Sequence, residues 1–126
     1  MKIAMKTRID VRRVYGDESE NPVDGYRVYV DRLWPRGESR ARFQYDMWAK
    51  QVAPSTELRE WFHADPQGRW EEFSRKYSGE LAGNPAVDLL VHDLKGRQHV
   101  TLLYSSKDTE HNNAVVLADY LRRELN

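Results

Sequence analysis

The chain has 126 residues, no cysteine, and 20 acidic against 20 basic side chains. This length is typical of one domain and too short for two, so we expect a single domain over residues 1–126. The absence of cysteine excludes disulfides, thiolate metal ligands and a cysteine nucleophile. Because the charges balance, the chain has no global positive field, and nucleic-acid binding is not expected without a local basic patch.

The apolar residues indicate a packed core and no membrane segment. The first residues, Met1 to Lys6, lack the continuous apolar run of a signal peptide, and no stretch approaches the roughly 18 apolar residues of a membrane span. Aromatic residues make up 11% of the chain, enough to form a core without a structural metal. We therefore expect a soluble, cytoplasmic protein without a membrane partner.

Two strands are predicted in the first part of the chain. Alternation of apolar and polar residues predicts a first strand through Ile3, Met5, Ile9 and Val11. Residues 17–25 are rich in turn-forming side chains and are predicted to form a surface loop. A second alternating run, from Tyr26 to Val30, must end near Asp31, because Pro35 and Gly37 are incompatible with a longer strand.

The middle of the chain predicts helices. A weak helical pattern runs from Phe43 to Val52 and is ended by Pro54, and Ser55 is a suitable N-cap for the next helix. Asp65 and Pro66 have the form of an N-cap and a first helical residue. The apolar stripe after them consists of Trp70, Phe73, Tyr77 and Leu81. Its helical spacing favours a core role over base stacking.

The last third predicts a helix, a strand and a helix. Asn84-Pro85 begins a helix that Gly96 ends, and His99 to Tyr104 has the composition of a strand buried on both faces. Asp108 is the predicted N-cap of the final helix. That helix has an apolar stripe, and its opposite, polar face carries Asp119, Arg122 and Arg123.

Strands that end in a polar break and lead into helices are typical of parallel α/β sheets. We predict a small, mostly parallel sheet of three or four strands flanked by helices, with Rossmann-like layering. The strands Tyr26 to Val30 and His99 to Tyr104 should be parallel neighbours. Since ligands bind beyond the carboxyl ends of such strands, the clusters 31–37 and 105–113 are expected at one shared edge.

Several specific motifs are distributed along the chain. They are Asp31-Arg32-Leu33-Trp34-Pro35-Arg36-Gly37, Ala53-Pro54-Ser55, Leu58-Arg59 with Trp61-Phe62-His63, and Thr101-Leu102-Leu103-Tyr104 followed by Asp108, His111, Asn112, Asn113 and Ala114. Together they resemble the YeaO-like proteins, the domain of unknown function 488 family, over nearly the whole chain. The resemblance implies a small stand-alone α/β domain from a bacterial or archaeal cytoplasm. It carries no established activity and assigns no catalytic residue.

The first cluster contains Arg32 and Arg36 on either side of Trp34. Two permanently charged guanidinium groups could hold one phosphate or carboxylate, with the indole as a stacking surface. The alternative is that Asp31 pairs with one of the arginines to order the loop and that Trp34 belongs to the core. On this string alone the second interpretation is favoured, because ion pairs that only order a loop are common.

The second cluster places Ser105, Ser106 and Lys107 before the predicted start of a helix, where backbone N–H groups favour an anion. The alternative is that Asp108 caps the helix and occupies those donors. His111 lies beside Asn112 and is an acid–base candidate near neutral pH. His63 could join it across the cleft, although a structural role fits either histidine alone.

These clusters predict binding of a small phosphorylated or nucleotide-like anion, with hydrolase or transferase activity as an extension. The expected ligand-binding residues are Arg32, Trp34, Arg36, Ser105, Lys107 and Asn112, with His111 and Asp31 as catalytic candidates. No spacing demands a metal, and no cofactor is indicated. The alternative is a non-enzymatic module that contacts protein or nucleic acid through the basic segment Arg36 to Arg42, which includes Arg40.

Overall fold

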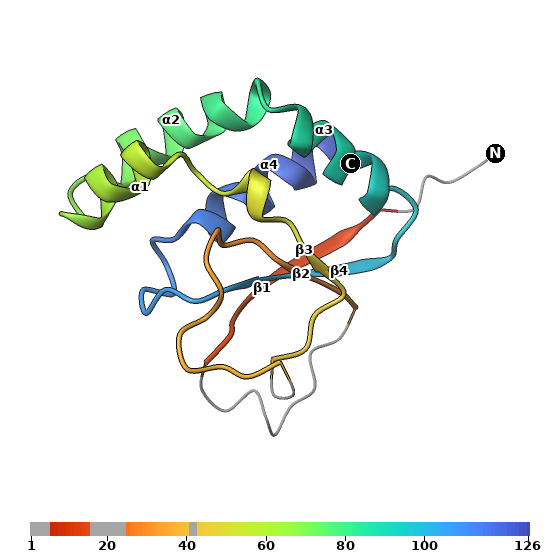
Figure 1. Ribbon diagram of the computed structural model, residues 1–126. Coiled ribbons are helices and arrows are strands. Elements are labelled where there is room, and N and C mark those ends of the chain that lie inside the picture. The colour runs from red at the N-terminus through yellow and green to blue at the C-terminus, as the bar shows by residue number, and fades with distance from the viewer. Residues whose placement is uncertain (1–5, 16–24, 41–42) are drawn as a thin grey trace.

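A computed structural model describes residues 6–15, 25–40 and 43–126 of the protein. These residues form one four-stranded sheet of β1 (Arg8–Arg13), β2 (Tyr26–Tyr29), β3 (Met47–Trp48) and β4 (His99–Tyr104) (Figure 1). The order across the sheet is β1-β4-β2-β3, and every neighbouring pair is parallel. The predicted pairing of the second strand with His99 to Tyr104 is confirmed, with Val28 beside Leu102.

The α-helices of the described chain lie on one face of the sheet (Figure 1). They are α1 (Thr56–His63), α2 (Trp70–Ala82), α3 (Pro85–Leu94) and α4 (Asn113–Leu125). Alternate strand residues point into this layer, and Val28 and Val100 are completely buried there together with Phe73 and Leu117 of the helices. The predicted α/β class and the small parallel sheet flanked by helices are therefore confirmed.

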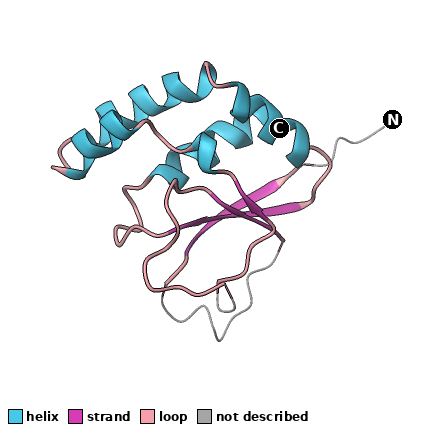
Figure 2. Cartoon of the chain, in the orientation of Figure 1, coloured by secondary structure: helices cyan, strands magenta, loops and turns pink. Residues whose placement is uncertain are grey.

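Loops cover the opposite face of the sheet (Figure 2). The strand residues that point this way, among them Tyr29 and Leu103, pack against an aromatic layer formed by Trp34, Phe43, Tyr45 and Trp48. The Trp34 ring lies edge-on to Phe43 at 5.3 Å and to Trp48 at 5.7 Å between centroids. Edge-to-face packing is favourable for aromatic pairs, so this layer closes the second face without a helix.

The helix predicted from Phe43 to Val52 is wrong. Met47–Trp48 instead forms β3, and only Lys50–Val52 is helical, as one 3-10 turn. The Asp46 and Ala49 amides donate to carbonyls of β2 at 2.8 Å each. Pairing with a neighbouring strand, which is not visible in the local periodicity, overrides the weak helical pattern.

Two predicted helix starts are also wrong. The Asp65 carboxylate accepts from the Gly68 amide at 3.1 Å and closes a turn, so that α2 begins only at Trp70. Asp108 likewise closes a turn, and α4 begins at Asn113 with Asn112 as its N-cap. Short acceptor side chains stabilise turns and helix starts by the same hydrogen bond, and the sequence did not distinguish between them.

Arg122, predicted on the polar face of the last helix, is held by contacts with β1 and with its own helix. Its guanidinium donates to the Ile9 carbonyl of β1 at 2.6 Å and pairs with Asp119 at 2.9 Å.

Two predictions lie wholly or largely outside the described residues. They concern Ile3 and Met5, assigned to the first strand, and nearly all of the predicted loop 17–25. Within the described ranges no helix is long and apolar enough to cross a membrane.

The core stripe of α2 generates a stability prediction. Phe73 is 1% exposed and stacks on Phe62 with 3.9 Å between ring centroids. Phe73→Ala removes this contact and leaves a cavity, which should cost about 3 to 5 kcal/mol in the free energy of unfolding. Leu89→Ala, at a side chain that is 69% exposed, is the control and should change stability by less than about 0.5 kcal/mol in denaturant melts. A loss below about 1 kcal/mol for Phe73→Ala would contradict the core assignment.

Candidate functional site

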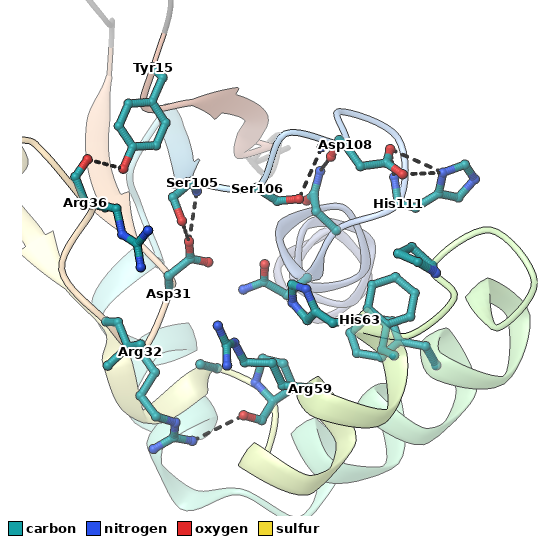
Figure 3. A pocket seen from close by; sticks show the side chains of 18 of the residues that line it. Tyr15, Asp31, Arg32, Arg36, Arg59, His63, Ser105, Ser106, Asp108 and His111 are labelled. Atoms are coloured by element: carbon teal, nitrogen blue, oxygen red, sulfur yellow. Dashed lines mark hydrogen bonds and ion pairs between the residues drawn. The ribbon is translucent and has the colours of Figure 1, made fainter.

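The two polar clusters line one cavity of about 370 Å³ at the carboxyl edge of the sheet (Figure 3). The loop after β2 contributes Asp31, Arg32 and Arg36, and the loop after β4 contributes Ser105 and Ser106. Arg59 and His63 of α1, Asn113 of α4 and the N-cap residue Asn112 complete the wall. The expected position of the site therefore coincides with this cavity, since parallel strands bring their following loops to one edge.

Asp31 joins the ends of the two central strands. Its Oδ2 atom accepts from the Ser105 backbone amide at 2.8 Å and from the Ser105 hydroxyl at 2.6 Å. Asn113 of α4 reaches the same place, because its side-chain amide donates to the Val30 carbonyl at 3.2 Å. Among the described residues Asp31 thus pairs with the second cluster and with no arginine, in contrast to the alternative considered from the sequence.

Three arginines contribute to the cavity wall from two elements. Arg32 turns away and donates to the Pro54 carbonyl at 3.3 Å. Arg36 and Arg59 are exposed, and Figure 3 shows the Arg36 side chain directed towards the cavity. Neither of these two guanidinium groups has a carboxylate partner within the described parts of the chain. The cavity wall therefore combines three arginines with two carboxylates, Asp31 and Asp108, and within the described ranges Arg36 and Arg59 form no ion pair with either.

Trp34 and Lys107 lie differently from what the sequence suggested. Trp34 borders the cavity, but its ring belongs to the aromatic layer and its indole N–H donates to the Glu38 carbonyl at 2.6 Å. Arg40 stacks over the same ring at 5.6 Å. Lys107 is exposed and is not part of the cavity wall. Arg42 lies outside the described residues.

Asp108 organises the turn that precedes α4. Its Oδ1 atom accepts from the Glu110 and His111 amides at 3.0 and 2.9 Å, and its Oδ2 atom contacts the His111 ring at 3.0 Å. Desolvation acts to raise the pKa of Asp108, but these hydrogen bonds outweigh it and hold the pKa below its usual range. The His111 ring also lies edge-on to Trp70, with 5.2 Å between centroids. His111 is thus held at the rim by groups that fix its ring.

Asn112 is 2% exposed, and its side chain is hydrogen-bonded to the backbone on both sides. Its side-chain oxygen accepts from the Val115 amide at 3.1 Å, and its side-chain amide donates to the Asp108 carbonyl at 2.9 Å. This residue caps α4 and ties the helix to the Asp108 turn. Its side chain contributes to the cavity wall with its hydrogen-bonding groups already engaged.

Arg59 is a cavity residue that the sequence analysis did not single out. It lies one helical turn before His63 on α1, and i,i+4 residues share a face of a helix. Desolvation at the cavity wall and, after it, the positive charge of Arg59 lower the pKa of His63 below its ordinary value, while Asp31 acts in the opposite direction. The spacing in α1 was the available signal, but only the fold places this face of α1 over the cavity.

The described residues contain no group of three or more histidine and acidic side chains that could hold a metal ion. The candidate acids and bases are each hydrogen-bonded within the protein, Asp31 to Ser105 and His111 to Asp108. Guanidinium and hydroxyl groups, which line this cavity, are hydrogen-bond donors.

Fold and cavity together define a one-domain parallel α/β protein with an arginine-lined pocket at the carboxyl edge of its sheet. The chain belongs to the DUF488-N3i family, whose model is described as an inactive DUF488-N3 subclade and matches residues 8–126. The family resemblance seen in the motifs is therefore confirmed.

Named relatives agree with this membership. The uncharacterized protein YeaO of Escherichia coli K12 is 43% identical over 114 residues, covering 90% of this chain and 96% of the relative. The uncharacterized protein Rv3073c of Mycobacterium tuberculosis H37Rv is 42% identical over 116 residues, covering 92% and 95% respectively. No solved structure matches the chain significantly.

The pairing of Arg59 with His63 can be tested by titration. Arg59→Met should raise the pKa of His63, because a positive charge that disfavours the imidazolium is removed. The pKa should stay below its ordinary value, since desolvation is the larger cause. Proton NMR of the histidine rings measures this, with His92 on α3, remote from the cavity, as the internal reference. An unchanged His63 titration would show that Arg59 does not face it.

Proposed function

We propose that the cavity binds a small phosphorylated or nucleotide-like anion and that the protein acts through this binding. The observation that carries the proposal is the pair Arg36 and Arg59, which reach one cavity from different elements without a described carboxylate partner. Planar guanidinium groups recognise phosphate and carboxylate through paired hydrogen bonds. An anion would satisfy both groups at once.

The size and polarity of the cavity support the same class of ligand. Its volume of about 370 Å³ is in the range of small-molecule sites. The Ser106 hydroxyl, which also belongs to the wall, offers an additional polar contact, and the Pro54 and Phe62 side chains form an apolar part of the wall. A ligand with a charged end and a less polar body would match a cavity wall that is polar in one part and apolar in another.

Several observations favour binding over turnover. The two catalytic candidates from the sequence, Asp31 and His111, are both engaged within the protein, with Ser105 and with Asp108 and Trp70 respectively. A general base must reach the proton that it removes, and these contacts restrain both groups. The description of the family as inactive agrees with a role in recognition.

The direct test is calorimetric titration with inorganic phosphate, pyrophosphate and a nucleoside monophosphate, preceded by a thermal-shift screen of the same compounds. Arg36→Met and Arg59→Met should each weaken binding about ten- to hundredfold, because each removes a charge-assisted contact. The two losses should be non-additive if both groups contact one phosphate. Thermal stability without ligand should change little, since both side chains are exposed.

Arg123→Met is the matched control, because Arg123 is exposed on α4 and is not part of the cavity wall. It should bind like the unmodified protein. If none of the anions binds at millimolar concentration, the anion site is wrong, and the basic segment that includes Arg36 and Arg40 becomes the leading interaction surface. Hydrolysis of a bound compound during the titration would contradict a purely binding role.

A further inference from the structure

The strand β1 forms one edge of the sheet, with β4 on its inner side. The Arg8 amide donates to the carbonyl of Gln98, directly before β4, at 2.9 Å, and the Val14 amide donates to the carbonyl of Tyr104, the last residue of β4, at 2.7 Å. Because backbone groups alternate in direction along a strand, the even-numbered residues of β1 face β4. Thr7, Ile9, Val11 and Arg13 therefore present their N–H and C=O groups to the outside.

The first half of this edge is covered by side chains from the end of the chain. The Asn126 side chain accepts from the Thr7 amide at 3.0 Å and donates to the Thr7 carbonyl at 3.2 Å, as a neighbouring strand would. Arg122 donates to the Ile9 carbonyl at 2.6 Å. Within the described residues, no partner reaches the backbone N–H of Ile9 or the outward groups of Val11 and Arg13.

We propose that two copies of this chain associate through this open part of β1, as antiparallel strands related by a two-fold axis at Val11. In this register Val11 lies opposite Val11 of the partner subunit, and Ile9 lies opposite Arg13 of the partner subunit. All of these residues point their backbone groups outwards, which is the requirement for hydrogen-bonded pairs in an antiparallel ladder. The shared Ile9 carbonyl can accept a second hydrogen bond beside that from Arg122.

The charges of β1 are self-complementary in the same register. Asp10 lies opposite Arg12 of the partner subunit, and the symmetry repeats this pair on the other side of the axis. Such a non-hydrogen-bonded pair brings side chains particularly close, where opposite charges stabilise and like charges destabilise. Arg12 has no ion-pair partner within the described residues, whereas Asp10 contacts His99 at 2.8 Å and Arg8 at 2.9 Å. A single-residue shift of the register would turn the backbone groups away from one another.

A second copy is a better occupant than an unrelated strand. A two-fold axis at Val11 places outward-facing backbone groups opposite one another and also places Asp10 opposite Arg12 of the partner subunit. An unrelated strand would have to match both the backbone groups and the charges. A dimer of this kind would join two four-stranded sheets into one continuous sheet and would keep the helices of both copies on one face. The surface lies on β1 and does not depend on what the cavity binds.

The test is sedimentation velocity of the full chain from about 1 µM to 1 mM, and we expect a reversible, concentration-dependent dimer. Arg12→Asp places two like-charged pairs at the axis and should weaken the dimer about tenfold or more. The double variant Asp10→Arg with Arg12→Asp exchanges the two charges and should restore association. Arg75→Asp is the control, because it makes the same charge change on α2, at a side chain that is 76% exposed.

Thermal melts of each variant establish that it is folded before its association is compared. A monomer over the whole concentration range would overturn the proposal. A dimer that Arg12→Asp leaves unchanged would place the interface on another surface, which also overturns it. A folded double variant that stays monomeric would refute the proposed register.

Discussion

The hydrogen bonds between the Asp31 carboxylate and Ser105 are the constraint that sets the geometry of the site. They tie the loop after β2 to the loop after β4, at the point where the two central strands end. Parallel strands by themselves only bring such loops to the same edge. The bonded carboxylate fixes their separation, and Asn113 adds a link from the start of α4 to Val30. Among the described residues Asp31 bonds to Ser105 and forms no ion pair with Arg36.

The apolar side chains on the two faces of the sheet are buried by different kinds of structure. The helices cover one face with aliphatic and aromatic side chains, in the manner of α/β proteins. The other face is covered by an irregular segment whose aromatic rings pack edge-on to one another. This segment begins directly after Asp31, so the chain that forms the cavity rim continues into the aromatic layer. The Trp34 ring, which the sequence offered as a stacking surface, is thereby engaged by Phe43 and Trp48.

The end of the chain contributes to the stability of β1. Arg122 and Asn126 satisfy outward backbone groups of Ile9 and Thr7, which would otherwise be exposed at a sheet edge. Exposed edges favour unwanted pairing, and proteins commonly cover them. Among the residues that the structure describes, this cover stops before Val11. The charged side chains on either side of Val11, Asp10 and Arg12, have opposite signs. The last turn of α4 therefore limits where the edge can be joined by another strand.

The fold class, the parallel pairing of the two central strands, the core stripe of α2 and the common edge of both polar clusters could all be predicted from the amino-acid sequence. Alternating apolar residues and helical stripes encode these features locally. Three outcomes required the folded chain: residues 47–48 form a strand, Asp108 closes a turn, and Arg59 and His63 face the cavity while Lys107 does not. The strand and the cavity wall depend on partners distant in the chain, such as β2 for Met47–Trp48, and local periodicity contains no information about such partners. The Asp108 turn is local, but the same side-chain hydrogen bond can close a turn or begin a helix, and the sequence does not distinguish between them.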